Sequence, residues 1–134
     1  MKNLVFTALI MCVCVSSGLS AFDYTVASYF DSTFPLNNQS LLVNGAGVKE
    51  IQANGDSYIE VKNTISLQPH VGGVETIRLW DTSSMNLLNG EVFNIYLGGL
   101  GCELSISGGS VLGEIWAADG YIDVSGGNVN EIYL

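Results

Sequence analysis

The sequence is poor in basic residues, cysteine and proline, and each shortage excludes a class of protein. Lysine and arginine total four against thirteen aspartates and glutamates, which gives a formal net charge of −9. An acidic surface of this kind repels phosphate backbones, so nucleic acid is not an expected partner. Two of the three cysteines fall within the first 20 residues. Cys102 alone cannot form an internal disulfide, so the chain is not a disulfide-stapled scaffold, and we expect Cys102 to be a small packing residue.

Long apolar runs are missing except at the start of the chain. Lys2 precedes an apolar run at 4–15, and small residues dominate the stretch 16–21 that follows. A basic start, a short apolar centre and a small-residue end are typical of a secretory signal peptide, and the run is too short to span a bilayer. We therefore predict that residues 1–21 are a signal peptide that is removed. The mature chain is expected to be secreted or held at the cell surface, with no transmembrane segment.

Glycine is abundant by contrast, with 16 residues, and it recurs within a repeated apolar pattern. Segments 41–53, 85–97 and 122–134 share apolar residues at the first, third, eighth, eleventh and thirteenth positions, with glycine near the middle. Related units begin at Ile59 and Leu104, so successive unit starts lie 18, 26, 19 and 18 residues apart. A self-similar period of this length is typical of solenoid proteins.

The spacing within each unit predicts two short strands joined by turns. Apolar residues at the first and third positions, and again at the eleventh and thirteenth, have the period of two that β-strands show. Glycines follow the first strand, and a second turn, such as Asn-Gly-Asp at 54–56, follows the later one. Stacked coils build a continuous apolar core that one coil lacks. We predict an all-β parallel β-solenoid (β-helix) of about five coils, with roughly 18–20 residues in each.

The alignment also predicts how the rest of the chain is organised. Residues 22–40 are expected to form an N-terminal cap segment over repeats that occupy 41–134. No comparable segment follows the last unit, so we expect no C-terminal cap and a solenoid that is truncated, a fragment of a longer protein. An eight-residue insertion within 62–73 explains the longest spacing and is expected to protrude from a corner. It carries His70, the only histidine of the chain, which we expect to be solvated rather than catalytic.

Functional side chains are expected on outward-facing columns, because stacking places equivalent residues of successive coils above one another. One column lies between the last two apolar positions of each unit, and another lies two residues earlier and faces the same way. The candidate ligand-face residues are Arg78, Tyr96, Trp116 and Tyr133 in the first column, and Asn94, Glu114 and Glu131 in the second. Aromatic rings can stack on the C–H face of a sugar while carboxylates and amides bind its hydroxyls. The alternative is that the rings only support one another across strands.

Two units also carry a resemblance. The stretches LSISGGSV at 104–111 and IDVSGGNV at 122–129 resemble the SGG-type repeats of secreted, glycine-rich β-solenoid proteins of bacterial cell surfaces. The resemblance implies a structural or adhesive role at the surface, with cell-surface glycans or extracellular proteins as partners. It implies no catalytic residues.

A fragment of a pectin-lyase-like carbohydrate-active enzyme is the alternative, because β-helices also host lyases and glycosidases. Such lyases need clustered aspartates for calcium and a basic residue that takes a proton, and glycosidases need two carboxylates on one face. Asp81 and Asp119 fall in equivalent turns, but Gly99 interrupts the series between them. Glu114 and Glu131 fall in adjacent coils. The sequence leaves enzymatic activity open but favours a non-enzymatic module, and it points to no cofactor, metal or catalytic residue.

Overall fold

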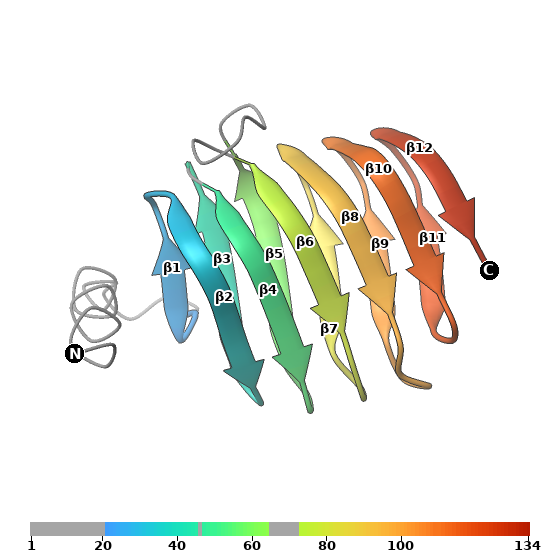
Figure 1. Cartoon of the computed structure of the whole chain (residues 1–134), viewed down its shortest axis with the longest axis horizontal. Coiled ribbons are helices and arrows are strands. Elements are labelled where there is room, and N and C mark those ends of the chain that lie inside the picture. The colour runs from blue at the N-terminus through green and yellow to red at the C-terminus, as the bar shows by residue number, and fades with distance from the viewer. Residues whose placement is uncertain (1–20, 46, 65–72) are drawn as a thin grey trace.

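The computed structural model describes residues 21–45, 47–64 and 73–134, and within these ranges every regular element is a β-strand (Figure 1). The strands are β1 (Tyr24–Val26), β2 (Phe30–Asn37), β3 (Ser40–Asn44), β4 (Val48–Asn54), β5 (Tyr58–Asn63), β6 (Val74–Leu79), β7 (Ser84–Leu87), β8 (Glu91–Leu97), β9 (Glu103–Ile106), β10 (Ser110–Ala117), β11 (Tyr121–Val124) and β12 (Asn128–Tyr133). The predicted signal peptide, apart from Ala21, and most of the predicted insertion, including His70, lie outside the described residues.

The strands alternate between two parallel sheets that face each other (Figure 1). The odd sheet has the order β1-β3-β5-β7-β9-β11, and the even sheet has the order β2-β4-β6-β8-β10-β12. Each odd strand and the even strand after it form one coil, so the six strands of each sheet make six coils. The predicted all-β parallel solenoid is therefore confirmed, with six coils where the alignment of repeats predicted about five.

The additional coil comes from residues 22–40, the segment expected to act as a cap. Its strand β1 pairs with β3, and β2 pairs with β4, so that Phe34 lies opposite Ile51. Aromatic rings fill this first coil: the ring centroids of Tyr24 and Phe30 lie 5.4 Å and 5.3 Å from that of Phe34, both in edge-to-face contact. Phe34 is only 1% exposed as a result. The first coil thus continues both sheets and closes the core with rings.

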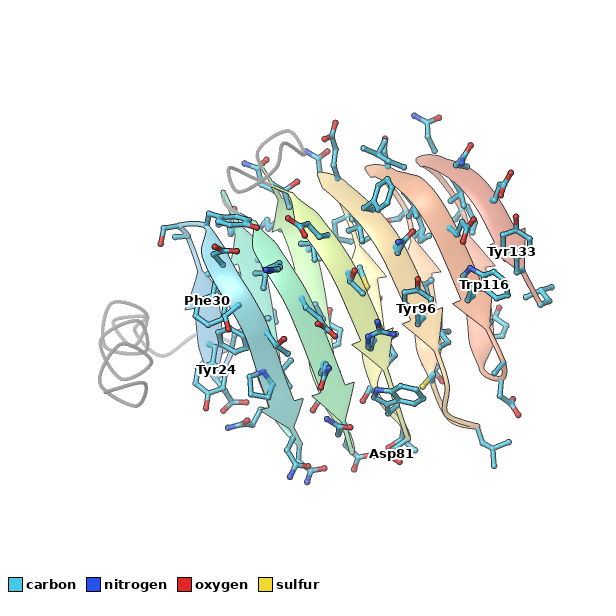
Figure 2. All side chains as sticks on the ribbon, viewed as in Figure 1. Tyr24, Phe30, Asp81, Tyr96, Trp116 and Tyr133 are labelled. Carbon is cyan, nitrogen blue, oxygen red and sulfur yellow. The ribbon has the colours of Figure 1, made fainter. Side chains whose placement is uncertain are left out.

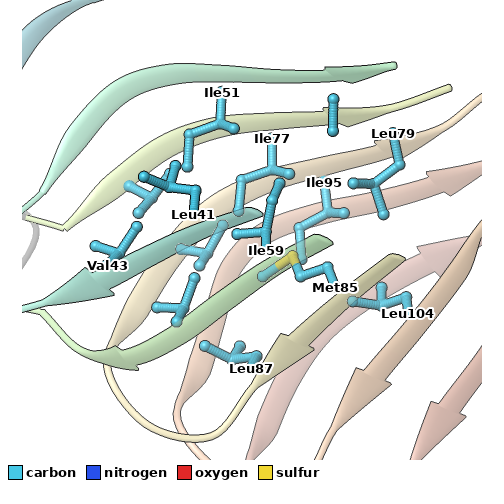
Figure 3. Close-up of a cluster of buried hydrophobic side chains, with 14 of the residues drawn as sticks. Leu41, Val43, Ile51, Ile59, Ile77, Leu79, Met85, Leu87, Ile95 and Leu104 are labelled. Carbon is cyan, nitrogen blue, oxygen red and sulfur yellow. The ribbon is translucent and has the colours of Figure 1, made fainter. Parts of the chain in front are cut away.

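The strand register confirms the alignment of the repeats. The first positions of the units lie opposite one another along the odd sheet, and the eleventh positions do so along the even sheet. These residues are Leu41, Ile59, Met85, Leu104 and Ile122 in the odd sheet, and Ile51, Ile77, Ile95, Ile115 and Ile132 in the even sheet. Both columns point into the space between the sheets, where Figure 3 shows part of the resulting core. Burial of aliphatic side chains in this interior is the main stabilising contribution to the fold.

Cys102 belongs to the buried core, and glycine is required at a corner between strands. Cys102 is 1% exposed within the core, and burial raises the pKa of its thiol, as expected for a packing residue. Gly109 has a φ of 72°, and a Cβ there would meet the backbone oxygen of Gly90 at 2.6 Å in the preceding coil. A side chain at that corner would therefore separate the coils.

In the part of the chain that the structure describes, no helix is long and apolar enough to cross a membrane.

Candidate ligand-binding face

The two predicted outward columns lie side by side on the outer face of the even sheet. The ring column consists of Gln52, Arg78, Tyr96, Trp116 and Tyr133, and the carboxylate column consists of Glu50, Thr76, Asn94, Glu114 and Glu131. Three rings of the first column come from the successive strands β8, β10 and β12, as Figure 2 shows for Tyr96, Trp116 and Tyr133. The structure therefore brings all seven predicted candidates onto one face.

A carboxylate, a guanidinium group and a ring form one cluster on this face. Arg78 Nε donates to Glu50 Oε1 at 2.9 Å, and the guanidinium carbon lies 4.7 Å from the centre of the Tyr96 ring. Hydrogen bonds to Glu50 from Gln52 first, and then from Arg78 and Thr33, lower the pKa of its carboxyl below the ordinary value despite some burial. The positive charge of Arg78 is thus held between a carboxylate and an aromatic face.

The last two coils carry carboxylates that hold rings in place. Trp116 Nε1 donates to Glu114 Oε2 at 2.6 Å, and Tyr133 Oη donates to Glu131 Oε2 at 2.5 Å. The hydrogen bond to Glu131 raises the pKa of the Tyr133 hydroxyl. The two rings stack with centroids 4.5 Å apart and planes at 17°. Mutual support across strands, the alternative to ligand binding, therefore does occur, but Trp116 and Tyr133 remain 45% and 39% exposed.

The side chain of Asn94 forms a hydrogen bond with the backbone of the neighbouring strand β10. Its Oδ1 accepts a hydrogen bond from the backbone N–H of Glu114 at 3.0 Å. Strand β10 has an irregular register between Val111 and Glu114, where the fourth repeat has one extra residue. Asn94 thus satisfies a backbone donor that the irregularity displaces, and this explains an amide at that position without a ligand.

An open groove of about 440 Å³ runs beside the ring column. Its lining is mostly apolar and consists of Arg78, Trp80, Tyr96, Leu97, Gly98, Trp116, Ala117, Ala118, Tyr133 and Leu134. Gly98 follows β8 in the fourth coil, and Ala118 lies just beyond β10 in the fifth. The rings of Tyr96 and Trp116 line the groove beside these small residues. The groove is therefore a consequence of pairing large residues in one column with Gly98 and Ala118 in the next.

Trp80 is the functional candidate that the repeat pattern did not identify. Its backbone N–H bonds to Ala53 of the preceding coil, and the N–H of Gly98 bonds to Leu79 in the same way, so both residues share one column. A Cβ on Gly98 would overlap Cζ3 and Cε3 of the Trp80 ring, so this ring lies across the next coil. The signal in the sequence was a tryptophan one coil before a glycine at the equivalent position.

The aspartates considered for a lyase-type calcium site are used in turns. Asp81 Oδ2 accepts the N–H of Gly55 at 2.9 Å, and Asp119 Oδ1 accepts the N–H of Gly120 at 2.8 Å. Within residues 21–45, 47–64 and 73–134, no group of three or more histidine, cysteine, aspartate or glutamate side chains is placed to hold a metal ion.

Comparisons with protein-family models, curated proteins and solved structures gave no match for the chain.

Proposed function

We propose that the chain is a secreted surface module of bacterial type, structural or adhesive, that binds glycans in the groove beside the ring column. The observation that carries the proposal is the groove itself. It combines exposed aromatic rings on rigid strands with a floor of glycine and alanine, and the flat C–H faces of pyranose rings fit such surfaces. Polar groups of the carboxylate column lie alongside and supply acceptors for sugar hydroxyls.

A β-solenoid suits this role because its strands fix the spacing of the rings. Successive strands of a parallel sheet lie about 4.8 Å apart, so a ligand that runs along the solenoid axis meets one coil after another at constant spacing. Preorganised rings lose little conformational entropy on binding. Elongated surfaces of this kind favour oligosaccharides over single sugars.

Glycan-array binding followed by calorimetry tests the proposal. The protein should bind a subset of oligosaccharides. Trp116→Ala should weaken that binding about tenfold or more, since one stacked ring is lost. Tyr121→Ala is the matched control, because Tyr121 is a ring of the odd sheet that is 65% exposed. Equal losses in both variants, or no binding to any glycan, would contradict the proposal. Release of reducing or unsaturated sugar from a bound glycan would instead support the enzymatic alternative.

Export is tested separately, with residues 1–21 fused to a reporter in a bacterial host. We expect the reporter outside the cytoplasm, cleaved after Ser20 or Ala21. A variant with Leu4, Val5 and Phe6 replaced by aspartate should remain inside, because the apolar centre is broken. If the uncleaved reporter stays inside the cell with both the wild-type and the substituted segment, secretion is refuted, and the glycan groove is unaffected by that result.

A further inference from the structure

On the outer face of the even sheet, glutamates of the carboxylate column lie near rings of the ring column in two regions. A cationic side chain accompanies them in only one of these regions. In the second to fourth coils, Glu50, Arg78 and Tyr96 place a positive group between a carboxylate and a ring. In the fifth and sixth coils the same two columns carry Glu114 with Trp116 and Glu131 with Tyr133, and no cationic side chain stands in either column there. The protein's own Arg78 therefore shows which kind of group this pair of columns accommodates.

From this repetition we propose that the groove prefers a glycan bearing protonated amino groups, an oligomer of glucosamine type, over neutral or acidic glycans. The inference rests on the proposed glycan-binding function and names its ligand class. An ammonium group beside Glu114 and Glu131 would gain both a charged hydrogen bond and attraction to the neighbouring ring.

The carboxylates retain the capacity to bind such a group. Each uses one oxygen for its ring partner, Glu114 for Trp116 Nε1 and Glu131 for Tyr133 Oη. An ionised carboxylate has about four lone-pair sites, so acceptor positions remain. The two glutamates lie opposite each other on adjacent strands β10 and β12, where their like charges repel. An ammonium group shared between them would relieve that repulsion.

Arg78 is the one charged side chain among the residues that line the groove, and its pairing with Glu50 offsets the attraction it would offer to an acidic ligand. Among the described cationic side chains, Arg78 is paired with Glu50 at 2.9 Å and Lys49 with Asp31 at 3.7 Å. Lys62 belongs to β5 of the odd sheet, away from the groove. With a formal net charge of −9, the chain repels uronic acid or sulfated polymers at long range as well. Electrostatic complementarity therefore selects a cationic glycan.

The test compares four probes by calorimetry: tetramers of glucosamine, of N-acetylglucosamine and of galacturonic acid, and tetralysine. All titrations use one mildly acidic buffer, which keeps the amino groups of the glucosamine tetramer protonated. We expect the glucosamine tetramer to bind about tenfold or more tightly than the acetylated one, and the galacturonate not to bind. Glu114→Gln with Glu131→Gln should abolish the preference, so that the glucosamine tetramer binds no more tightly than the acetylated one, because glutamine still accepts the hydrogen bonds from the rings but carries no charge.

Glu103→Gln with Asp123→Asn is the control for net charge, since it removes two charges from the odd sheet. It should preserve the preference. If both double variants lose it equally, or if the acetylated tetramer binds as tightly, the amino-sugar inference fails while glycan binding stands. If tetralysine binds as tightly as the glucosamine tetramer, the ligand is a basic peptide and the inference also fails. Absence of binding to every saccharide overturns the proposed function itself.

Discussion

At the scale of single residues, Gly98 decides where the ring of Trp80 lies. An alanine Cβ at position 98 would overlap Cζ3 and Cε3 of that ring, which must then leave the next coil. We expect Gly98→Ala to weaken glycan binding about tenfold while changing the free energy of unfolding by about 1 kcal/mol or less. Calorimetric titration and urea unfolding measure the two quantities.

A double-mutant cycle with Trp80→Ala shows whether the glycine acts through the ring. If it does, adding Gly98→Ala to Trp80→Ala changes binding no further, because the ring is already gone. Independent, additive losses would show that the methyl group disturbs the groove directly, and unchanged binding in Gly98→Ala would remove Trp80 from the site.

The ring column could be predicted residue by residue, whereas Trp80 could not. Arg78, Tyr96, Trp116 and Tyr133 follow from the period alone, because the repeat fixes the register and register fixes which side chains share a face. Trp80 lies just beyond β6, where the repeats carry unrelated residues. Its direction depends on the space left by a residue one coil away, which is a tertiary effect that a period does not encode.

Two tyrosines give the protein a pH dependence in the alkaline range. Burial, followed by hydrogen bonds to Glu60 and Glu75 respectively, raises the pKa of Tyr58 and of Tyr29 from 10.0 to about 12. The folded state holds these protons more tightly than the unfolded state. The resulting stabilisation is therefore complete below about pH 10 and is lost as the pH rises toward about 12.

Urea unfolding at a series of alkaline pH values checks this expectation. The free energy of unfolding should fall over that window in the wild-type chain and fall less steeply in Tyr58→Phe, which has no proton to lose at that position. Tyr121→Phe serves as the control, because this ring is 65% exposed. An identical slope in wild type and Tyr58→Phe would contradict the assignment.

At the scale of strands, the cost of a core substitution depends on which coil contains it. Ile95 and Ile132 occupy the same column, but Ile95 is 0% exposed while Ile132 is 43% exposed in the sixth coil. We expect Ile95→Ala to destabilise the fold by about 2–5 kcal/mol, through lost burial and the cavity left between sheets. Ile132→Ala should cost about 1 kcal/mol, since its side chain is partly in water already.

Urea denaturation monitored by tryptophan fluorescence measures both values on the same chain. The comparison has an internal control, because the two substitutions remove the same atoms from equivalent positions. Similar losses at both positions would mean that the sixth coil is covered in solution, and that its exposure in the monomer is not the relevant state.

The strands of coils two to six could be predicted, and those of the first coil could not. Its even strand has an irregular register between Phe30 and Thr33 and contains Pro35, so the thirteen-residue pattern is broken there. Proline lacks an N–H donor and is tolerated on an edge strand, where no further strand pairs. Among the strands that the structure describes, β2 pairs on one side only, with β4, and it therefore tolerates a proline that a central strand would not.

At the scale of the whole molecule, excess negative charge opposes folding. Thirteen acidic residues face four basic ones, and parallel stacking places Glu114 and Glu131 on neighbouring strands. Self-repulsion of this kind destabilises the compact state, while the ion pairs of Lys49 and Arg78 partly offset it. Since the acidic residues greatly outnumber the basic ones, screening should on balance stabilise the fold.

We therefore expect the melting temperature to rise with sodium chloride, mostly between about 0.01 M and 0.15 M, where the Debye length falls from about 30 Å to about 8 Å. Thermal unfolding followed by circular dichroism measures the rise. Glu114→Gln with Glu131→Gln should raise the melting temperature at low salt and reduce its salt dependence, because two like charges on adjacent strands are gone. A rise that continues unchanged to about 1 M would indicate a general salt effect on apolar burial instead. A melting temperature that falls over the lower range would show that the two ion pairs outweigh the repulsion.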